Sequence, residues 1–168
     1  MATINQHFHP VYLALGTNLG DRQQNLKQAL QKLPPQITVL NTSRLYETAP
    51  AYVIDQPAFL NMALKGQTNL SPEELLIYLK HIEDEMGRQQ TIRYGPRIID
   101  LDILFFDDWV LNTPDLQIPH PRLAERGFVL YPLADIAANL VHPVYHKTVK
   151  ELLDALPEDA GIMQVTNG

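Results

Sequence analysis

The sequence of 168 residues contains no cysteine, so disulfide bonds and thiolate chemistry are both excluded. It has no apolar run near the roughly 20 residues that a membrane-spanning helix needs. Its N-terminal residues lack the basic start and apolar stretch of a secretion signal. From these absences we expect a cytoplasmic protein that makes no contact with a membrane.

Positive charge is also scarce, because 13 lysines and arginines face 19 aspartates and glutamates, for a formal net charge of −6. Nucleic-acid-binding proteins are normally basic, so we expect no nucleic-acid partner. A small phosphorylated ligand is nevertheless compatible with an acidic chain in which arginines gather locally. Five arginines do lie within one stretch of the chain: Arg88, Arg93, Arg97, Arg122 and Arg126.

Apolar residues make up 45% of the sequence and fall into short periodic segments, which is typical of a globular domain. The predicted strands are residues 11–15, 37–46, 59–65 and 98–106, and the predicted helices are residues 22–33 and 72–86. The order strand, helix, two strands, helix, strand predicts an α+β fold, a ferredoxin-like plait with a mostly antiparallel sheet and helices packed on one face. A doubly wound parallel sheet is disfavoured, because no helix separates the second strand from the third.

The chain beyond residue 107 is proline-rich and predicts loops, followed by one short helix from Thr148 to about residue 156. No repeat or linker divides the sequence, so residues 1–168 are predicted to be a single domain. We expect residues 1–10 to be a loosely held leader and residues 158–168 a flexible tail. His7 and His9 form a candidate metal pair, but the neighbouring sequence offers no carboxylate or third histidine to complete a site.

The strongest chemical signal is the triplet Asp100-Leu101-Asp102 inside an apolar strand. Alternate side chains of a strand share a face, so both carboxylates should project together while Leu101 faces the other way. Two neighbouring carboxylates repel each other unless a cation lies between them, and Mg²⁺ prefers such oxygen ligands together with phosphate oxygens. An isolated triplet also fits a solvated strand end, but the apolar flanks favour a magnesium site for two ions.

Three arginines, Arg88, Arg93 and Arg97, precede this strand. Guanidinium groups make bidentate phosphate contacts and neutralise charge on a leaving phosphate. The polar segment 87–96 ends in Gly95-Pro96 and predicts a loop that folds over a bound nucleotide. The alternative interpretation is an ordinary basic loop facing solvent.

Two weaker signals lie elsewhere in the chain. The segment from Gly16 to Asp21 joins a strand to a helix, but it has no lysine and lacks the spacing of a phosphate-binding loop. A tight turn in which Gly16 allows another group to approach the backbone is the better interpretation. His120 lies between two prolines, and the residues alone leave a structural role and a phosphate contact equally open.

The run Arg93-Tyr94-Gly95-Pro96-Arg97, followed by Asp100-Leu101-Asp102-Ile103-Leu104, resembles the signature of the 6-hydroxymethyl-7,8-dihydropterin pyrophosphokinase family. Similar stretches run from Leu15-Gly16-Thr17-Asn18-Leu19-Gly20 to Arg126-Gly127-Phe128. The resemblance implies the plait fold and transfer of pyrophosphate from ATP to the pterin hydroxymethyl group, with release of AMP, in folate biosynthesis. Its implied partners are ATP and 6-hydroxymethyl-7,8-dihydropterin, and a monomer is expected.

The resemblance also implies roles for individual residues. The catalytic residues that it implies are Arg88, Arg97, Asp100 and Asp102, with the two aspartates holding two Mg²⁺ ions. As ATP contacts it implies Arg88, Arg93, Arg97, Ile103, His120 and Arg126, with Ile103 as a wall of the adenine pocket. As pterin contacts it implies Gly16, Thr48, Ala51, Phe59, Asn61 and Phe128, with the two phenylalanine rings enclosing the pterin.

Two other classes of protein remain open. A nucleotidyltransferase also holds two metals on paired aspartates, although the glycine-serine motif expected before them is missing. A non-catalytic module that binds a pterin or a nucleotide is the other alternative.

Overall fold

The computed structural model describes residues 7–87, 95–157 and 161–166. Six strands form the main sheet in the order β5-β1-β4-β3-β8, and β2 pairs with β4 further along that strand from β3. All of these pairs are antiparallel. The strands are β1 (His9–Thr17), β2 (Ile37–Thr42), β3 (Leu45–Thr48), β4 (Phe59–Thr68), β5 (Asp100–Phe106) and β8 (Ile162–Thr166). The predicted α+β plait with an antiparallel sheet is confirmed.

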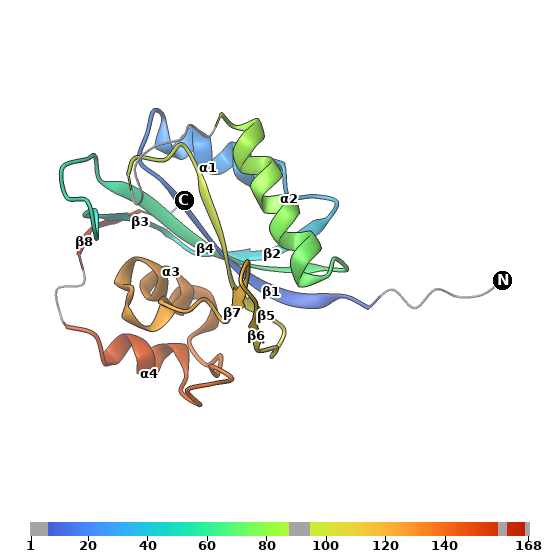
Figure 1. The fold of residues 1–168 in the computed structure, drawn as a ribbon. Coiled ribbons are helices and arrows are strands. Elements are labelled where there is room, and N and C mark those ends of the chain that lie inside the picture. The colour runs from blue at the N-terminus through green and yellow to red at the C-terminus, as the bar shows by residue number, and fades with distance from the viewer. Residues whose placement is uncertain (1–6, 88–94, 158–160, 167–168) are drawn as a thin grey trace.

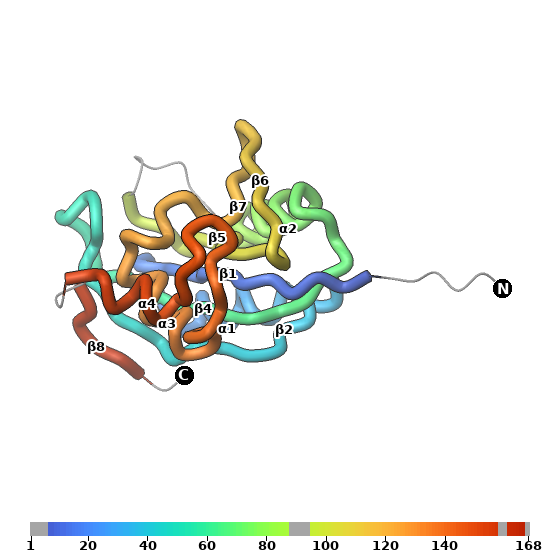
Figure 2. The backbone as a smooth tube through the Cα atoms, turned by 90° about the horizontal axis from the view of Figure 1, so that it is seen from below, coloured from blue at the N-terminus to red at the C-terminus, as the bar shows by residue number. Residues whose placement is uncertain are grey.

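Helices cover both faces of this sheet (Figure 1). The helices α1 (Arg22–Gln31) and α2 (Pro72–Glu85) lie on one face, and α3 (Gly127–Ala137) and α4 (Val149–Asp154) lie on the other. A 3-10 turn, Leu123–Glu125, precedes α3. A small hairpin, β6 (Leu111–Asn112) and β7 (Gln117–Ile118), projects away from the sheet (Figure 2).

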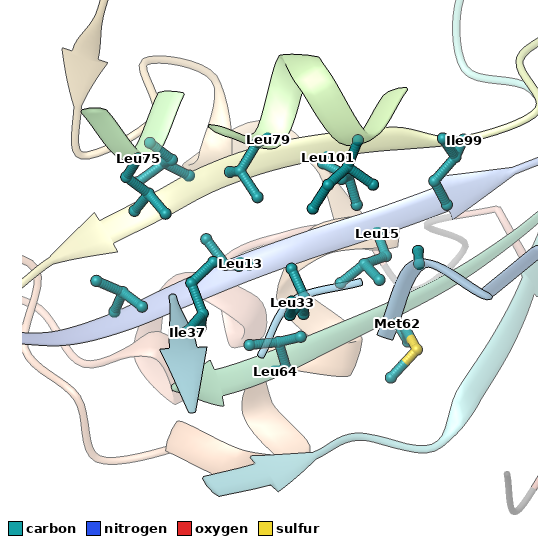
Figure 3. Close-up of a cluster of buried hydrophobic side chains, with 14 of the residues drawn as sticks. Leu13, Leu15, Leu33, Ile37, Met62, Leu64, Leu75, Leu79, Ile99 and Leu101 are labelled. Atoms are coloured by element: carbon teal, nitrogen blue, oxygen red, sulfur yellow. The ribbon is translucent and has the colours of Figure 1, made fainter. Parts of the chain in front are cut away.

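The larger core lies between the sheet and α1 and α2. Leu75 and Leu79 of α2 are fully buried and point toward the strands, where Leu13 and Leu101 meet them (Figure 3). The helix begins with a capping box, in which the Glu74 amide donates to Ser71 Oγ at 3.2 Å. Local capping and the 3.6-residue apolar period therefore agree, which explains why the sequence predicts this helix well.

The second core corrects the prediction of a loop-rich C-terminal third. Helix α3 buries Leu130 and Leu133 against the sheet face that carries Tyr12. Pro132 stands inside this helix and obscures it in the sequence, because proline removes one helical hydrogen bond. Burial of each leucine is worth about 1.5–3 kcal/mol, so the tertiary packing offsets the proline penalty of about 3 kcal/mol.

Three predicted segment bounds also need correction. Residues 9 and 10 of the expected leader belong to β1, which begins at His9. Residues 162–166 of the expected tail form β8, whose register with β3 pairs Leu45 with Thr166. The single strand expected over 37–46 is two strands. The strand is interrupted at Ser43, whose hydroxyl accepts from the Ala63 amide at 2.9 Å.

No helix among the described segments combines the length and the apolar character that a bilayer crossing requires.

Candidate active site

A cavity of about 380 Å³ opens at the end of the sheet where β1 finishes. The strand register explains how distant residues meet there, since Gly16 of β1 lies opposite Asn61 of β4 on one side and Asp100 of β5 on the other. The lining residues come from β1, β3, β4, β5, α3 and the loops between them: Ala14, Leu15, Gly16, Thr48, Ala49, Ala51, Tyr52, Gln56, Phe59, Asn61, Gly95, Arg97, Asp100, Asp102, His120, Arg122, Arg126, Phe128 and Val129.

Small residues on β1 keep this end of the sheet hollow. Tyr12, Ala14 and Gly16 share one face of the strand. The Tyr12 side chain fills the core under α3, whereas the side chains at positions 14 and 16 are progressively smaller. A Cβ atom at Gly16 would lie 2.8 Å from Asn61 Oδ1, closer than any normal contact. The predicted close approach at Gly16 is therefore confirmed, and the approaching group is the amide of Asn61.

The acidic wall of the cavity is Asp100 and Asp102, which both line it from β5, while Leu101 between them is buried in the core. The prediction that both carboxylates share one face is confirmed. Glu83 of α2, itself buried, accepts from the Leu101 amide at 2.8 Å and ties the strand to the helix. Two carboxylates fixed on a rigid strand match the ligand chemistry of a hard divalent cation.

The cationic wall combines Arg97, Arg122, Arg126 and His120. Burial, followed by the charges of Arg126 and Arg122, lowers the pKa of His120 to about 4. The Arg122 amide donates to His120 Nδ1 at 3.3 Å, so Nδ1 is the unprotonated nitrogen and Nε2 carries the proton. At neutral pH His120 is thus an uncharged donor beside two guanidinium groups, which suits an anionic ligand.

Sequence reasoning assigned no role to Tyr52 or Arg122. The Tyr52 ring lies 4.7 Å from the guanidinium carbon of Arg122 and 5.4 Å from that of Arg126. Arg126 Nε also donates to the Tyr52 hydroxyl at 3.0 Å. The signal for Arg122 was its membership of the arginine cluster, whereas nothing local in the sequence marks the contact with Tyr52.

The remaining part of the cavity lining is aromatic and polar. Phe59 reaches it from β4 and Phe128 from the first turn of α3, so two rings from separate elements line one space. The buried Asn61 donates from Nδ2 to Thr48 Oγ1 at 2.6 Å. Ala51 completes this part of the lining. The six predicted pterin contacts therefore gather in one place, which is what a flat heterocycle with polar edges requires.

Asn18, buried and assigned no role from the sequence, joins three segments around the cavity. Its Nδ2 donates to Gln56 Oε1 and to the Pro57 carbonyl, each at 3.0 Å. Its Oδ1 accepts from the Arg97 amide at 2.7 Å, and its own amide donates to the Arg97 carbonyl at 2.9 Å. One side chain thereby fixes the end of β1, the loop before β4 and the backbone that carries Arg97.

Three predicted ATP contacts are not among the residues that line this cavity. Arg88 and Arg93 fall outside the described residues. Ile103 is 4% exposed and packs in the core on the α2 face of β5, so its side chain does not wall this cavity. The period of the strand explains this placement, because Ile103 follows Leu101 onto the face opposite to Asp100 and Asp102.

Paired carboxylates, a cationic wall and two aromatic rings in one cavity suit an anionic ligand that carries a flat ring or binds beside one, on a ferredoxin-like α+β fold. Residues 12–138 match the sequence profile of the family described as 7,8-dihydro-6-hydroxymethylpterin-pyrophosphokinase. The match spans well over half of the chain, and the chain therefore belongs to this pyrophosphokinase family.

Individual relatives agree with this assignment. The chain is 43% identical to 2-amino-4-hydroxy-6-hydroxymethyldihydropteridine pyrophosphokinase of Aquifex aeolicus, over 84% of this chain and 88% of that protein. The Bacillus subtilis protein of the same name is 49% identical over 77% of this chain and 78% of its own length. The folic acid synthesis protein FOL1 of Dictyostelium discoideum is 44% identical over 92% of this chain, which spans only 24% of that longer relative.

The fold likeness extends to more distant structures. The crystal structure of Plasmodium falciparum HPPK-DHPS with pteroate superposes with a TM-score of 0.74 at 21% identity, covering 88% of this chain and 42% of that one. At this identity the superposition supports the fold alone.

Proposed function

We propose that this chain transfers pyrophosphate from ATP to the hydroxymethyl group of 6-hydroxymethyl-7,8-dihydropterin and releases AMP, as a single pyrophosphokinase domain in folate biosynthesis. The observation that carries the proposal is that one cavity is lined both by a carboxylate–arginine group and by an aromatic–amide group. Its volume of about 380 Å³ lies in the range of small-molecule sites. Close relatives named for this reaction support the same conclusion.

Asp100 and Asp102 would hold the divalent metal that an ATP-dependent pyrophosphokinase requires, and we propose two Mg²⁺ ions. The donor set fits, because hard cations take carboxylate oxygens and complete their shell with phosphate oxygens and water. When bound, Mg²⁺ neutralises charge on the phosphate chain. The chain's own contribution is rigidity, since Glu83 fixes the backbone between the two aspartates.

Arg97, Arg126 and His120 are the proposed phosphate contacts, and Arg122 joins them from the same wall. In the transfer step the pterin hydroxymethyl oxygen bonds to the β-phosphorus while the bond from that phosphorus to the AMP oxygen breaks, and the hydroxyl proton leaves to solvent. Guanidinium groups that contact the phosphates would stabilise the charge that develops on the departing AMP. No side-chain base is needed if alignment and charge stabilisation supply the rate.

Phe59 and Phe128 are the proposed walls for the pterin ring, and Asn61 and Thr48 the contacts to its polar edge. A ring held between aromatic side chains gains dispersion and stacking energy while its heteroatoms remain available to amide and hydroxyl groups. Gly16 belongs to the same contact set, because its missing side chain leaves Asn61 Oδ1 in place.

Product analysis tests the proposal. Purified protein with ATP, Mg²⁺ and 6-hydroxymethyl-7,8-dihydropterin should release AMP, and omission of the pterin should stop release. Release of pyrophosphate would identify a nucleotidyltransferase instead, and saturable binding without turnover would identify a non-catalytic module. Asp100→Ala and Asp102→Ala should each abolish turnover, and near-normal activity in either would contradict the metal assignment. The monomeric state, the absence of a nucleic-acid partner and the cytoplasmic location stay predictions.

A further inference from the structure

A histidine–carboxylate cluster lies at the far end of β5 from the active site. His7 precedes β1, His9 is the first residue of that strand, and Asp107 follows the last residue of β5. One ligand atom from each of the three lies within 4.8 Å of the others. The carboxylate that the sequence does not offer near His7 and His9 is thus supplied by strand pairing, from 98 positions further along the chain.

Two of the three side chains are held in position by the fold. The His9 ring packs 5.0 Å from the Phe106 ring and 4.9 Å from the Trp109 ring, measured between centroids. Asp107 adopts a left-handed conformation with φ of 52°, and its amide donates to the Pro10 carbonyl at 2.7 Å. Asp107 Oδ1 accepts from the Asp108 amide at 3.0 Å, which orients the carboxylate so that Oδ2 faces His9.

The spacing fits a tetrahedral metal. His9 Nδ1 and Asp107 Oδ2 are 3.1 Å apart, whereas two ligands bound at the usual Zn²⁺ distances in a tetrahedron lie roughly 3.3 Å apart. His7 is exposed, so its ring can close the remaining distance without disturbing the core. Two imidazoles and one carboxylate also match the donor set that binds Zn²⁺ rather than Mg²⁺, with a water molecule as the fourth ligand.

We propose that His7, His9 and Asp107 form a Zn²⁺ site that fastens the segment before β1 to the turn after β5. The site is separate from the magnesium ligands, because Asp107 lies seven residues beyond Asp100, roughly 20 Å along an extended strand. The proposal does not depend on the proposed function, since none of the three residues lines the active-site cavity.

The test is a Zn²⁺ titration in competition with a chromophoric chelator, on protein free of ATP and magnesium. The protein titrated is the Asp100→Ala, Asp102→Ala double variant, which lacks the other carboxylate pair. Its expected loss of turnover does not matter, because the experiment measures metal binding alone. This protein should bind one equivalent of Zn²⁺, and Co²⁺ in its place should give the visible bands of a tetrahedral complex.

His7→Ala should weaken Zn²⁺ binding by about tenfold or more, as expected when a ligand or its support is lost. The exposed His7 ring meets the His9 ring edge-on, with the centroids 4.7 Å apart, so the variant removes this contact but keeps the packing of His9 against Phe106 and Trp109. His81→Ala is the matched control, because His81 also contacts a carboxylate, Glu85, at 2.7 Å but belongs to no such triad among the described residues. Zn²⁺ binding unchanged by His7→Ala, or reduced equally by His81→Ala, would overturn the proposal, as would the absence of a one-equivalent site.

Discussion

Truncation of Asn18 to alanine is the sharpest test of how the active site is held together. The substitution removes two donated hydrogen bonds, to Gln56 Oε1 and the Pro57 carbonyl, and one accepted from the Arg97 amide. At a net value of about 1 kcal/mol each, the three bonds contribute roughly 3 kcal/mol. The backbone bond between Asn18 and the Arg97 carbonyl survives, so Arg97 should become misplaced rather than lost.

We expect about half of this energy or more to be lost from transition-state stabilisation at the active site and the rest from the global stability of the fold. A loss of 1.4–2.7 kcal/mol in transition-state stabilisation corresponds to a decrease of roughly 10- to 100-fold in kcat/KM. Steady-state kinetics with both substrates measure this loss, and a thermal melt measures the remaining effect on stability.

Asn25→Ala is the matched control for this experiment. Asn25 Nδ2 donates to Thr17 Oγ1 and to the Leu19 carbonyl, so it supports the same turn without touching Gln56 or Arg97. If Asn25→Ala impairs turnover as much as Asn18→Ala does, loosening of the turn explains both and the reasoning about Arg97 is refuted. Full activity in Asn18→Ala would refute it as well.

Four further results are expected. Gly16→Ala should raise the KM for the pterin by roughly tenfold, because the added methyl group meets Asn61 Oδ1 at 2.8 Å, while calorimetric ATP affinity stays unchanged. Phe128→Ala should weaken pterin binding far more than ATP binding, and equal losses would contradict the aromatic pocket. Asp102→Asn should keep the melting temperature but lose turnover, and retained turnover would exclude it as a metal ligand. His120, with its pKa lowered to about 4, should stabilise the fold fully above about pH 6.5, and this stabilisation, at most roughly 3 kcal/mol, should disappear as the pH falls from 6.5 to 4. Melts of His120→Gln should lack that pH dependence, and an unchanged profile would show that another group causes it.

Local periodicity explains which parts of the site could be predicted. The two carboxylates of Asp100 and Asp102 share a face because a strand has a period of two, and that fact is contained in three consecutive residues. The cap at Ser71 is equally local, since the partner groups lie within one helical turn. Features of this kind need no knowledge of the rest of the chain.

Long-range contacts explain what was missed. Asn18 resembles any polar residue in a turn until the fold brings Gln56 and Arg97 to it, 38 and 79 positions away along the chain. Helix α3 was hidden for a related reason, since Pro132 argues locally against a helix and only burial against the sheet reverses that preference. Ile103, an ATP contact implied by family likeness, has its side chain in the core on the face of β5 opposite to Asp100 and Asp102, as the strand period predicts.

The apolar pattern of β5 therefore determines where Asp100 and Asp102 lie as well as which residues enter the core. Leu101 is buried under α2, and a slip of one residue in the pairing with β1 would turn Asp100 and Asp102 into that core and expose Leu101. Burying two carboxylates without a partner costs several kcal/mol, so the correct register is selected by the same energy that folds the sheet. The bond from the Leu101 amide to Glu83 then fixes that register at the level of the active site. The burial of Leu101 therefore keeps the two carboxylates on the cavity face even where they repel each other.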